Sequence, residues 1–118
     1  MKESPVFGRT HDLLQWLLRV TEHFPRGQRF VLARRVQDTA FDLQEALLEA
    51  GITSGPGRAP ALQRADVQLA KLRYYLRLSR EMDWLGVGQY EHASVMLDEI
   101  GRFTGGWRRK ERESSPGA

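Results

Sequence analysis

The stretch Ala33-Arg34-Arg35-Val36-Gln37-Asp38-Thr39-Ala40-Phe41-Asp42-Leu43-Gln44-Glu45-Ala46-Leu47-Leu48-Glu49-Ala50 decides the fold class, because its apolar residues recur at alternating intervals of three and four. That spacing places them on one face of an α-helix, where they form a seam for a neighbouring helix. The seam consists of Ala33, Val36, Ala40, Leu43, Leu47 and Ala50. We therefore expect a helix over residues 27–50, followed by Gly51 at the position where glycine commonly ends a helix.

The same spacing recurs on both sides of this stretch. The segment 60–82 has a seam of Leu62, Ala65, Leu69, Leu72, Leu76 and Ser79. The segment 86–107 has a seam of Tyr90, Ala93, Leu97, Ile100, Thr104 and Trp107. The first segment, from residue 5 or 10 to residue 23, has Leu13, Leu14, Leu17 and Leu18. No segment sustains the alternation of apolar and polar residues that would predict strands.

Short connectors between four such segments favour antiparallel neighbours. We therefore predict an all-α fold, an antiparallel up-down-up-down four-helix bundle, in one domain over residues 1–107. Residues 108–118 are polar and include Ser114-Ser115-Pro116-Gly117, so we expect a disordered tail there. Residues 52–59, with Gly55-Pro56-Gly57, are expected to form a flexible connector.

Composition excludes several kinds of chemistry. The chain has no cysteine, which removes disulfides and thiolate sites. It has no uninterrupted run of about 18 apolar residues, so we expect no secretion signal, no membrane span and a cytoplasmic location. The three histidines lie far apart, and the Glu-x-x-His pairs of di-metal bundles are absent. We expect no metal, no cofactor and no catalytic residues, and hence a protein that is not an enzyme.

The basic residues are more informative than the net charge of +3. Fifteen of the eighteen are arginine, whose planar guanidinium stacks on bases and grips phosphate. The alternative explanation is a GC-rich genome, whose codons favour arginine over lysine.

Antiparallel topology gathers many of these arginines at one end of the bundle. They are Arg19, Arg26, Arg29, Arg34, Arg35, Arg73, Arg77 and Arg80. Five acidic residues share that end, so its excess of three positive charges equals the net charge of the chain. One such end would bind nucleic acid weakly, whereas an oligomer would multiply the number of phosphates contacted.

Some apolar residues lie outside the seams. These are Tyr74 and Trp84 near the third helix, and Met96 and Phe103 on the fourth. They are either additional core or a subunit interface. A second hypothesis is a protein-interaction module, in which the basic stripe Arg73, Arg77 and Arg80 meets the acidic stripe Asp38, Asp42, Glu45 and Glu49 between subunits.

Several longer strings occur in an order that resembles a known family. They are Val6-Phe7-Gly8-Arg9-Thr10-His11-Asp12-Leu13-Leu14-Gln15-Trp16-Leu17-Leu18, Phe24-Pro25-Arg26-Gly27-Gln28-Arg29-Phe30, Ala65-Asp66-Val67 with Lys71-Leu72-Arg73, Gln89-Tyr90-Glu91-His92-Ala93, Leu97-Asp98-Glu99-Ile100-Gly101-Arg102 and Gly105-Gly106-Trp107. Over residues 5–107 the chain resembles the accessory variability determinant proteins of diversity-generating retroelements. The bundle proteins encoded by intervening sequences of bacterial ribosomal RNA genes are the nearest alternative.

The resemblance implies a four-helix bundle that assembles into a positively charged homopentameric barrel. It also implies association with the retroelement's reverse transcriptase and with nucleic acid, RNA or DNA, during mutagenic retrohoming. Arg26 and Arg29 match the family's string before its second helix, and Arg73 and Arg77 match its basic third helix. Arg34, Arg35 and Arg80 join this expected nucleic-acid site from the geometry of the bundle alone.

Overall fold

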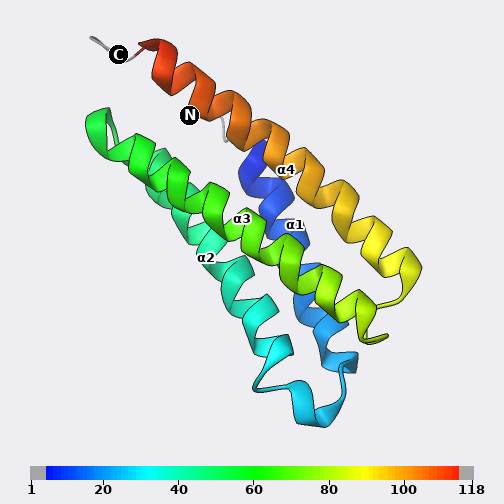
Figure 1. Ribbon diagram of the computed structural model, residues 1–118. Helices are drawn as coiled ribbons and strands as arrows, with labels where there is room; N and C mark the ends of the chain where they lie inside the picture. The colour runs from blue at the N-terminus through cyan, green and yellow to red at the C-terminus, as the bar shows by residue number, and fades with distance from the viewer. Residues whose placement is uncertain (1–4, 115–118) are drawn as a thin grey trace.

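The computed structural model describes residues 5–114, and in that range the chain forms helices and turns without a strand. The elements are α1 (Pro5–Val20), η1 (Thr21–His23), η2 (Arg26–Gln28), α2 (Leu32–Ile52), η3 (Gly55–Gly57), α3 (Arg58–Glu81) and α4 (Val87–Ser114). Consecutive α-helices run in opposite directions, as Figure 1 shows. Helices α1 and α3 each pack against both α2 and α4. The all-α prediction, with four long helices packed side by side, is confirmed.

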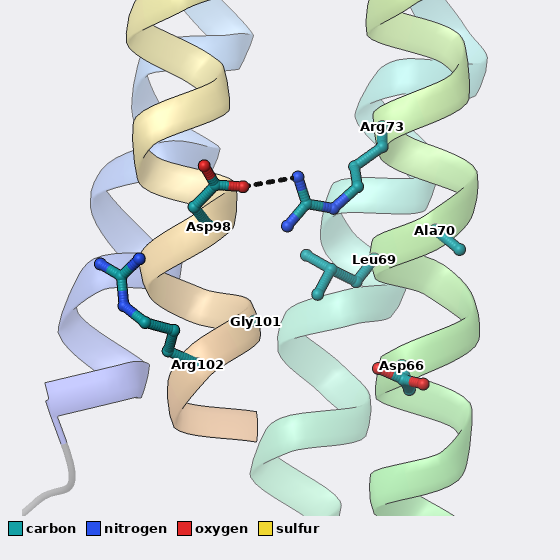
Figure 2. Close-up of a pocket in the computed structure, with 7 residues that line it drawn as sticks. All are labelled: Asp66, Leu69, Ala70, Arg73, Asp98, Gly101 and Arg102. Carbon is teal, nitrogen blue, oxygen red and sulfur yellow. Dashed lines mark hydrogen bonds and ion pairs between the residues drawn. The ribbon is translucent and has the colours of Figure 1, made fainter. Parts of the chain in front are cut away.

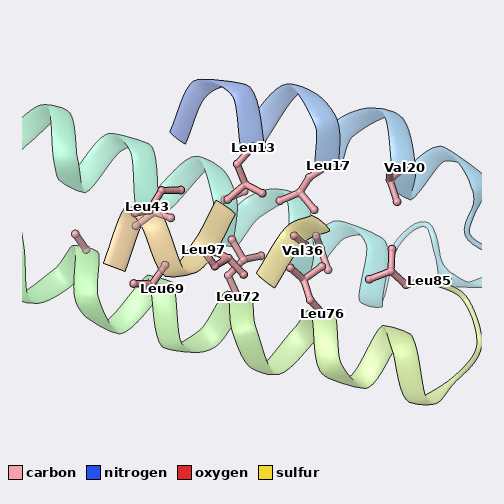
Figure 3. Close-up of a cluster of buried hydrophobic side chains, with 14 of the residues drawn as sticks. Leu13, Leu17, Val20, Val36, Leu43, Leu69, Leu72, Leu76, Leu85 and Leu97 are labelled. Atoms are coloured by element: carbon pink, nitrogen blue, oxygen red, sulfur yellow. The ribbon is translucent and has the colours of Figure 1, made fainter. Parts of the chain in front are cut away.

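The core lies along the predicted seams. All six seam residues of α2 and all six of α3 are buried. Figure 3 shows how leucines such as Leu13, Leu72 and Leu97 from different helices meet in one cluster. The two polar seam residues keep their hydroxyls satisfied within their own helices, because Ser79 Oγ donates to Tyr75 O at 2.7 Å and Thr104 Oγ1 donates to Ile100 O at 2.9 Å. Their burial therefore leaves neither hydroxyl without a partner.

No helix within residues 5–114 is long and apolar enough to cross a lipid bilayer.

The second helix begins and ends later than the sequence predicts. Pro25 has an extended backbone, and the residues after it form a tight turn in which Gln28 N donates to Pro25 O at 2.8 Å. The chain needs this turn to reverse direction, so α2 starts at Leu32 instead of Gly27. Gly51 does not end the helix, because α2 continues to Ile52. A β-carbon on Gly51 would lie 3.0 Å from Phe7 Cζ, so its small size serves the packing of α1 on α2.

The connector between α2 and α3 is held by specific contacts, whereas the sequence predicted that it would be flexible. Its centre is the 3-10 turn η3, and α3 begins directly afterwards at Arg58. Arg58 Nε donates to Ala50 O at 3.0 Å and to Thr53 O at 2.9 Å, and its guanidinium lies 5.7 Å from the centre of the Trp107 ring. The charged side chain thus satisfies carbonyls at the end of α2, where a cation is favoured.

The expected disordered tail is wrong for residues 108–114, which continue α4 as helix to Ser114. Two ion pairs hold these turns on α3: Arg108 Nη1 lies 2.9 Å from Asp66 Oδ2, and Glu111 Oε1 lies 3.0 Å from Arg58 Nη1. Composition alone could not reveal them, because both partners come from α3. The rest of the expected tail, residues 115–118, lies outside the described residues.

The turn between α3 and α4 closes the opposite end of the molecule. Asp83 has a φ of 63°, the left-handed conformation that often follows a helix. This turn buries Leu85 completely and brings Trp84 against Phe24, with ring centres 6.3 Å apart. The α1–α2 and α3–α4 connections therefore lie at the same end, as the sequence predicts.

Candidate nucleic-acid interface

Most of the predicted arginines gather at the end that holds the α1–α2 and α3–α4 connections (Figure 1). We call this the basic end and define it by Arg26, Arg29, Arg34, Arg35, Arg77 and Arg80. The first two lie in or next to η2, the next two in the first turn of α2, and the last two in the last turns of α3. The topology thus brings together arginines that are more than fifty positions apart in the sequence.

Three arginines of the basic end have acidic partners on their own helix or in the turn after it. Arg34 Nε lies 3.4 Å from Asp38 Oδ2, Arg77 Nε 3.6 Å from Glu81 Oε2, and Arg80 Nη1 3.1 Å from Asp83 Oδ1. In each pair at least one side chain is largely exposed. Exposed pairs of this kind contribute little to stability, so a phosphate could replace the carboxylate at low cost.

Arg26, Arg29 and Arg35 are exposed and form no ion pair with any other residue in 5–114. No carboxylate of the described residues lies within ion-pair distance of these guanidinium groups, and in this sense we call the three arginines uncompensated. Because uncompensated guanidinium groups set the local potential, these three residues make the basic end attractive to anions.

Arg73 lies apart from the basic end, nearer the middle of α3, and has a structural contact. Its Nη1 lies 2.9 Å from Asp98 Oδ1 on α4, as Figure 2 shows. Its Nη2 would lie 3.3 Å from a β-carbon on Gly101, so this glycine leaves room for the guanidinium. The pair spans a groove of about 510 Å³ that Asp66 and Arg102 also line. This groove contains both acidic and basic side chains, whereas Arg26, Arg29 and Arg35 have no acidic partner within ion-pair distance among the described residues.

The four predicted interface residues divide into two pairs. Trp84 and Met96 are half-buried and pack against the core of the same chain, so packing within one molecule explains why they are apolar. Tyr74 and Phe103 leave 58% and 38% of their surface exposed.

The sequence analysis missed a second exposed apolar region, along α1 and α2. Phe41 and Leu48 flank Gln44 on one side of α2, and Gln44 Nε2 donates to Phe7 O on α1. On α1, Leu14 follows Phe7 by seven residues and Leu18 follows Leu14 by four, so both lie on the side of α1 whose Phe7 contacts α2. We call Leu14, Leu18, Phe41 and Leu48 the α1–α2 apolar face. Leu14 is half-buried and the other three are exposed.

The acidic and basic stripes do not meet within the described chain. Glu49 Oε1 lies 2.6 Å from Arg64 Nη2, and Asp38 pairs with Arg34. Nor do residues 5–114 contain a group of three or more histidine, aspartate or glutamate side chains placed to hold a metal ion.

Comparison with known proteins adds one finding to this geometry. A family model described as bAvd-like matches residues 6–111. The matched range runs from the first turn of α1 almost to the end of α4, and it includes every arginine of the basic end. A search of curated proteins gives no match.

Proposed function

The chain belongs to the bAvd-like family, and from this membership we propose that it is a cytoplasmic accessory subunit of a diversity-generating retroelement. It binds the element's reverse transcriptase and the template RNA or its DNA copy, and it supports mutagenic retrohoming without catalysing a reaction itself.

The observation that carries the nucleic-acid part is the uncompensated charge of Arg26, Arg29 and Arg35 at one end of the molecule. Arginine is suited to phosphate because its planar fork donates two parallel hydrogen bonds. The proposed contact residues are Arg26, Arg29, Arg34, Arg35, Arg73, Arg77 and Arg80. Arg73 is the weakest member of this set, since it would have to leave Asp98.

Self-association into a homopentamer is part of the proposal. Exposed apolar side chains support it, because a small monomer gains by burying surfaces such as the α1–α2 apolar face or Tyr74 and Phe103. Several copies would present several basic ends to one polyanion. Affinity would then exceed that of one chain without any new kind of contact.

The test of the nucleic-acid part is charge reversal at the basic end. We expect Arg26→Glu plus Arg29→Glu to lower the affinity for a labelled RNA by about tenfold or more at low salt. We also expect the slope of log K against log salt to fall by about 1.4, since each lost single-strand phosphate contact removes about 0.7. Fluorescence anisotropy over a salt series measures both quantities.

Arg109→Glu plus Arg112→Glu is the matched control. Both residues are exposed on the last turns of α4, at the opposite end, and neither pairs with an acidic residue within 5–114. The charge change is identical, so only position differs. Equal losses in the two variants would reduce the effect to net charge and contradict a site at the basic end.

Binding to the reverse transcriptase is tested separately by co-purification of the two proteins after nuclease treatment. Retention of the enzyme by wild type supports a direct protein contact. If the polymerase co-purifies while wild type binds no nucleic acid at low salt, the protein-interaction hypothesis replaces the nucleic-acid one.

A further inference from the structure

Phe30 is the most exposed aromatic ring within residues 5–114, with 82% of its surface accessible. It lies in the turn between η2 and α2, so no helix packs over it. An isolated exposed apolar residue needs no explanation by itself. Phe30 differs because its sequence neighbours are the uncompensated arginines of the basic end.

The ring also lines a groove between α2 and α3, two helices that lie side by side in Figure 1. This groove, which we call the Phe30 groove, has a volume of about 470 Å³. Phe30, Arg34 and Arg35 line it from the α2 side, and Gln68, Lys71 and Tyr75 line it from the α3 side. The volume lies within the range of sites that take small organic ligands.

The composition of the groove changes along its length. Because α2 and α3 are antiparallel, Phe30, Arg35 and Tyr75 lie toward the basic end, and Gln68 lies farthest from it. Asp42, which also lines the groove, lies at the same far end. The near half thus combines two aromatic rings with guanidinium groups. It also contains Asp38, whose carboxylate lies 3.4 Å from Arg34 Nε, whereas Asp42 places a second carboxylate at the far end, where it would repel phosphate.

Aromatic rings beside arginines are the combination that binds single-stranded nucleic acid, because every unpaired base has a flat face and every linkage a negative charge. We propose that the Phe30 groove binds an unpaired nucleotide of a single strand, its base stacked on Phe30 and its phosphates held by Arg35 and the neighbouring Arg29. The inference rests on the proposed function and adds to it a preference for unpaired strands. A paired base is stacked within its duplex and cannot lie on the ring.

The test compares unpaired and paired strands with variants of Phe30. We expect Phe30→Ala to lower the affinity for an unstructured RNA by about 5- to 150-fold, the range that corresponds to the loss of one stacked base. Affinity for a duplex RNA should change less than about twofold, and the salt dependence should stay unchanged because no phosphate contact is removed. Phe30→Tyr keeps the ring and should bind the single strand as wild type does.

Ile52→Ala is the matched control, since Ile52 is 87% exposed at the far end of α2 and is equally apolar. It should leave both affinities unchanged. DNA of the same sequence forms a further arm: an equal loss with DNA supports stacking without discrimination of the sugar. A loss confined to RNA also supports the groove and shows that bound DNA places no base on Phe30.

Three results would overturn the inference. An unchanged single-strand affinity of Phe30→Ala would exclude base stacking. An equal loss of affinity for single strand and duplex would exclude it as well. A lower molar mass of Phe30→Ala by light scattering would assign the ring to a contact between copies instead. If charge reversal at Arg26 and Arg29 abolishes binding while Phe30→Ala does not, the proposed function stands and the inference alone fails. Absence of binding by wild type would refute both.

Discussion

At the scale of single residues, two helical glycines differ in what surrounds them. Gly105 in α4 has open space where a β-carbon would lie, whereas at Gly51 in α2 that position is 3.0 Å from the Phe7 ring. We expect Gly105→Ala to raise the free energy of unfolding by about 0.5–1 kcal/mol, because alanine loses less backbone entropy than glycine. The free energy of unfolding of Gly51→Ala should be about 1–3 kcal/mol lower than that of Gly105→Ala, because the new methyl group displaces the Phe7 ring.

Urea unfolding at one protein concentration measures both variants, and the midpoint is compared at constant m-value. Phe7 also makes an edge contact with Trp107, at 6.1 Å between ring centres, so displacing it disturbs α4 as well. Equal stabilisation by both substitutions would show that α1 can shift away from α2 without cost.

At the scale of elements, Arg58 joins three of them: the end of α2, the start of α3 and the last turns of α4. We expect Arg58→Ala to lower the free energy of unfolding by about 2 kcal/mol, because carbonyls and the Glu111 carboxylate lose charged hydrogen bonds. Arg64→Ala is the control, since its pair with Glu49 is half-exposed and should contribute less than about 1 kcal/mol. Chemical denaturation measures the difference.

A second readout tests the same element for local order. If Arg58 holds the end of α4, trypsin should cleave after Arg109 and Arg112 faster in Arg58→Ala than in wild type or Arg64→Ala. Rapid cleavage after Arg109 and Arg112 in all three proteins would contradict an ordered end of α4. It would favour the disordered tail that the sequence composition predicts.

At the scale of the whole molecule, the proposed pentamer predicts a light-scattering mass of about five times the 13.6 kDa of one chain. We expect Phe41→Glu plus Leu48→Glu to lower that mass, because two carboxylates would be buried without partners in the α1–α2 apolar face. Tyr74→Glu plus Phe103→Glu is the comparison, because these two residues are the other exposed apolar side chains named in the proposal. The reverse pattern would move the interface to the residues that the sequence analysis selected.

Circular dichroism of each variant separates loss of assembly from loss of fold. A variant with unchanged helix content and lower mass has lost only the interface. A wild-type mass equal to one chain would contradict the pentamer, and one basic end would then have to bind nucleic acid without the help of avidity.

The sequence by itself determined the helices and their seams, because a period near 3.6 residues is a local property of an α-helix. It also determined the family, whose strings run from α1 to α4 and which the family match confirms. Antiparallel order followed from the short connectors, and with it the gathering of arginines at one end. Each of these predictions depends only on residues that are close in the sequence, or on the direction of a single helix.

Only the tertiary structure decided which charges are compensated and which apolar residues are covered. Arg73 and Asp98 lie on different helices, as do Arg58 and Glu111, so no spacing in the sequence could pair them. The exposure of Phe30 depends on α2 starting at Leu32 and on the course of the preceding turn. Ion pairs and burial depend on contacts between distant segments, and those contacts exist only once the helices are packed.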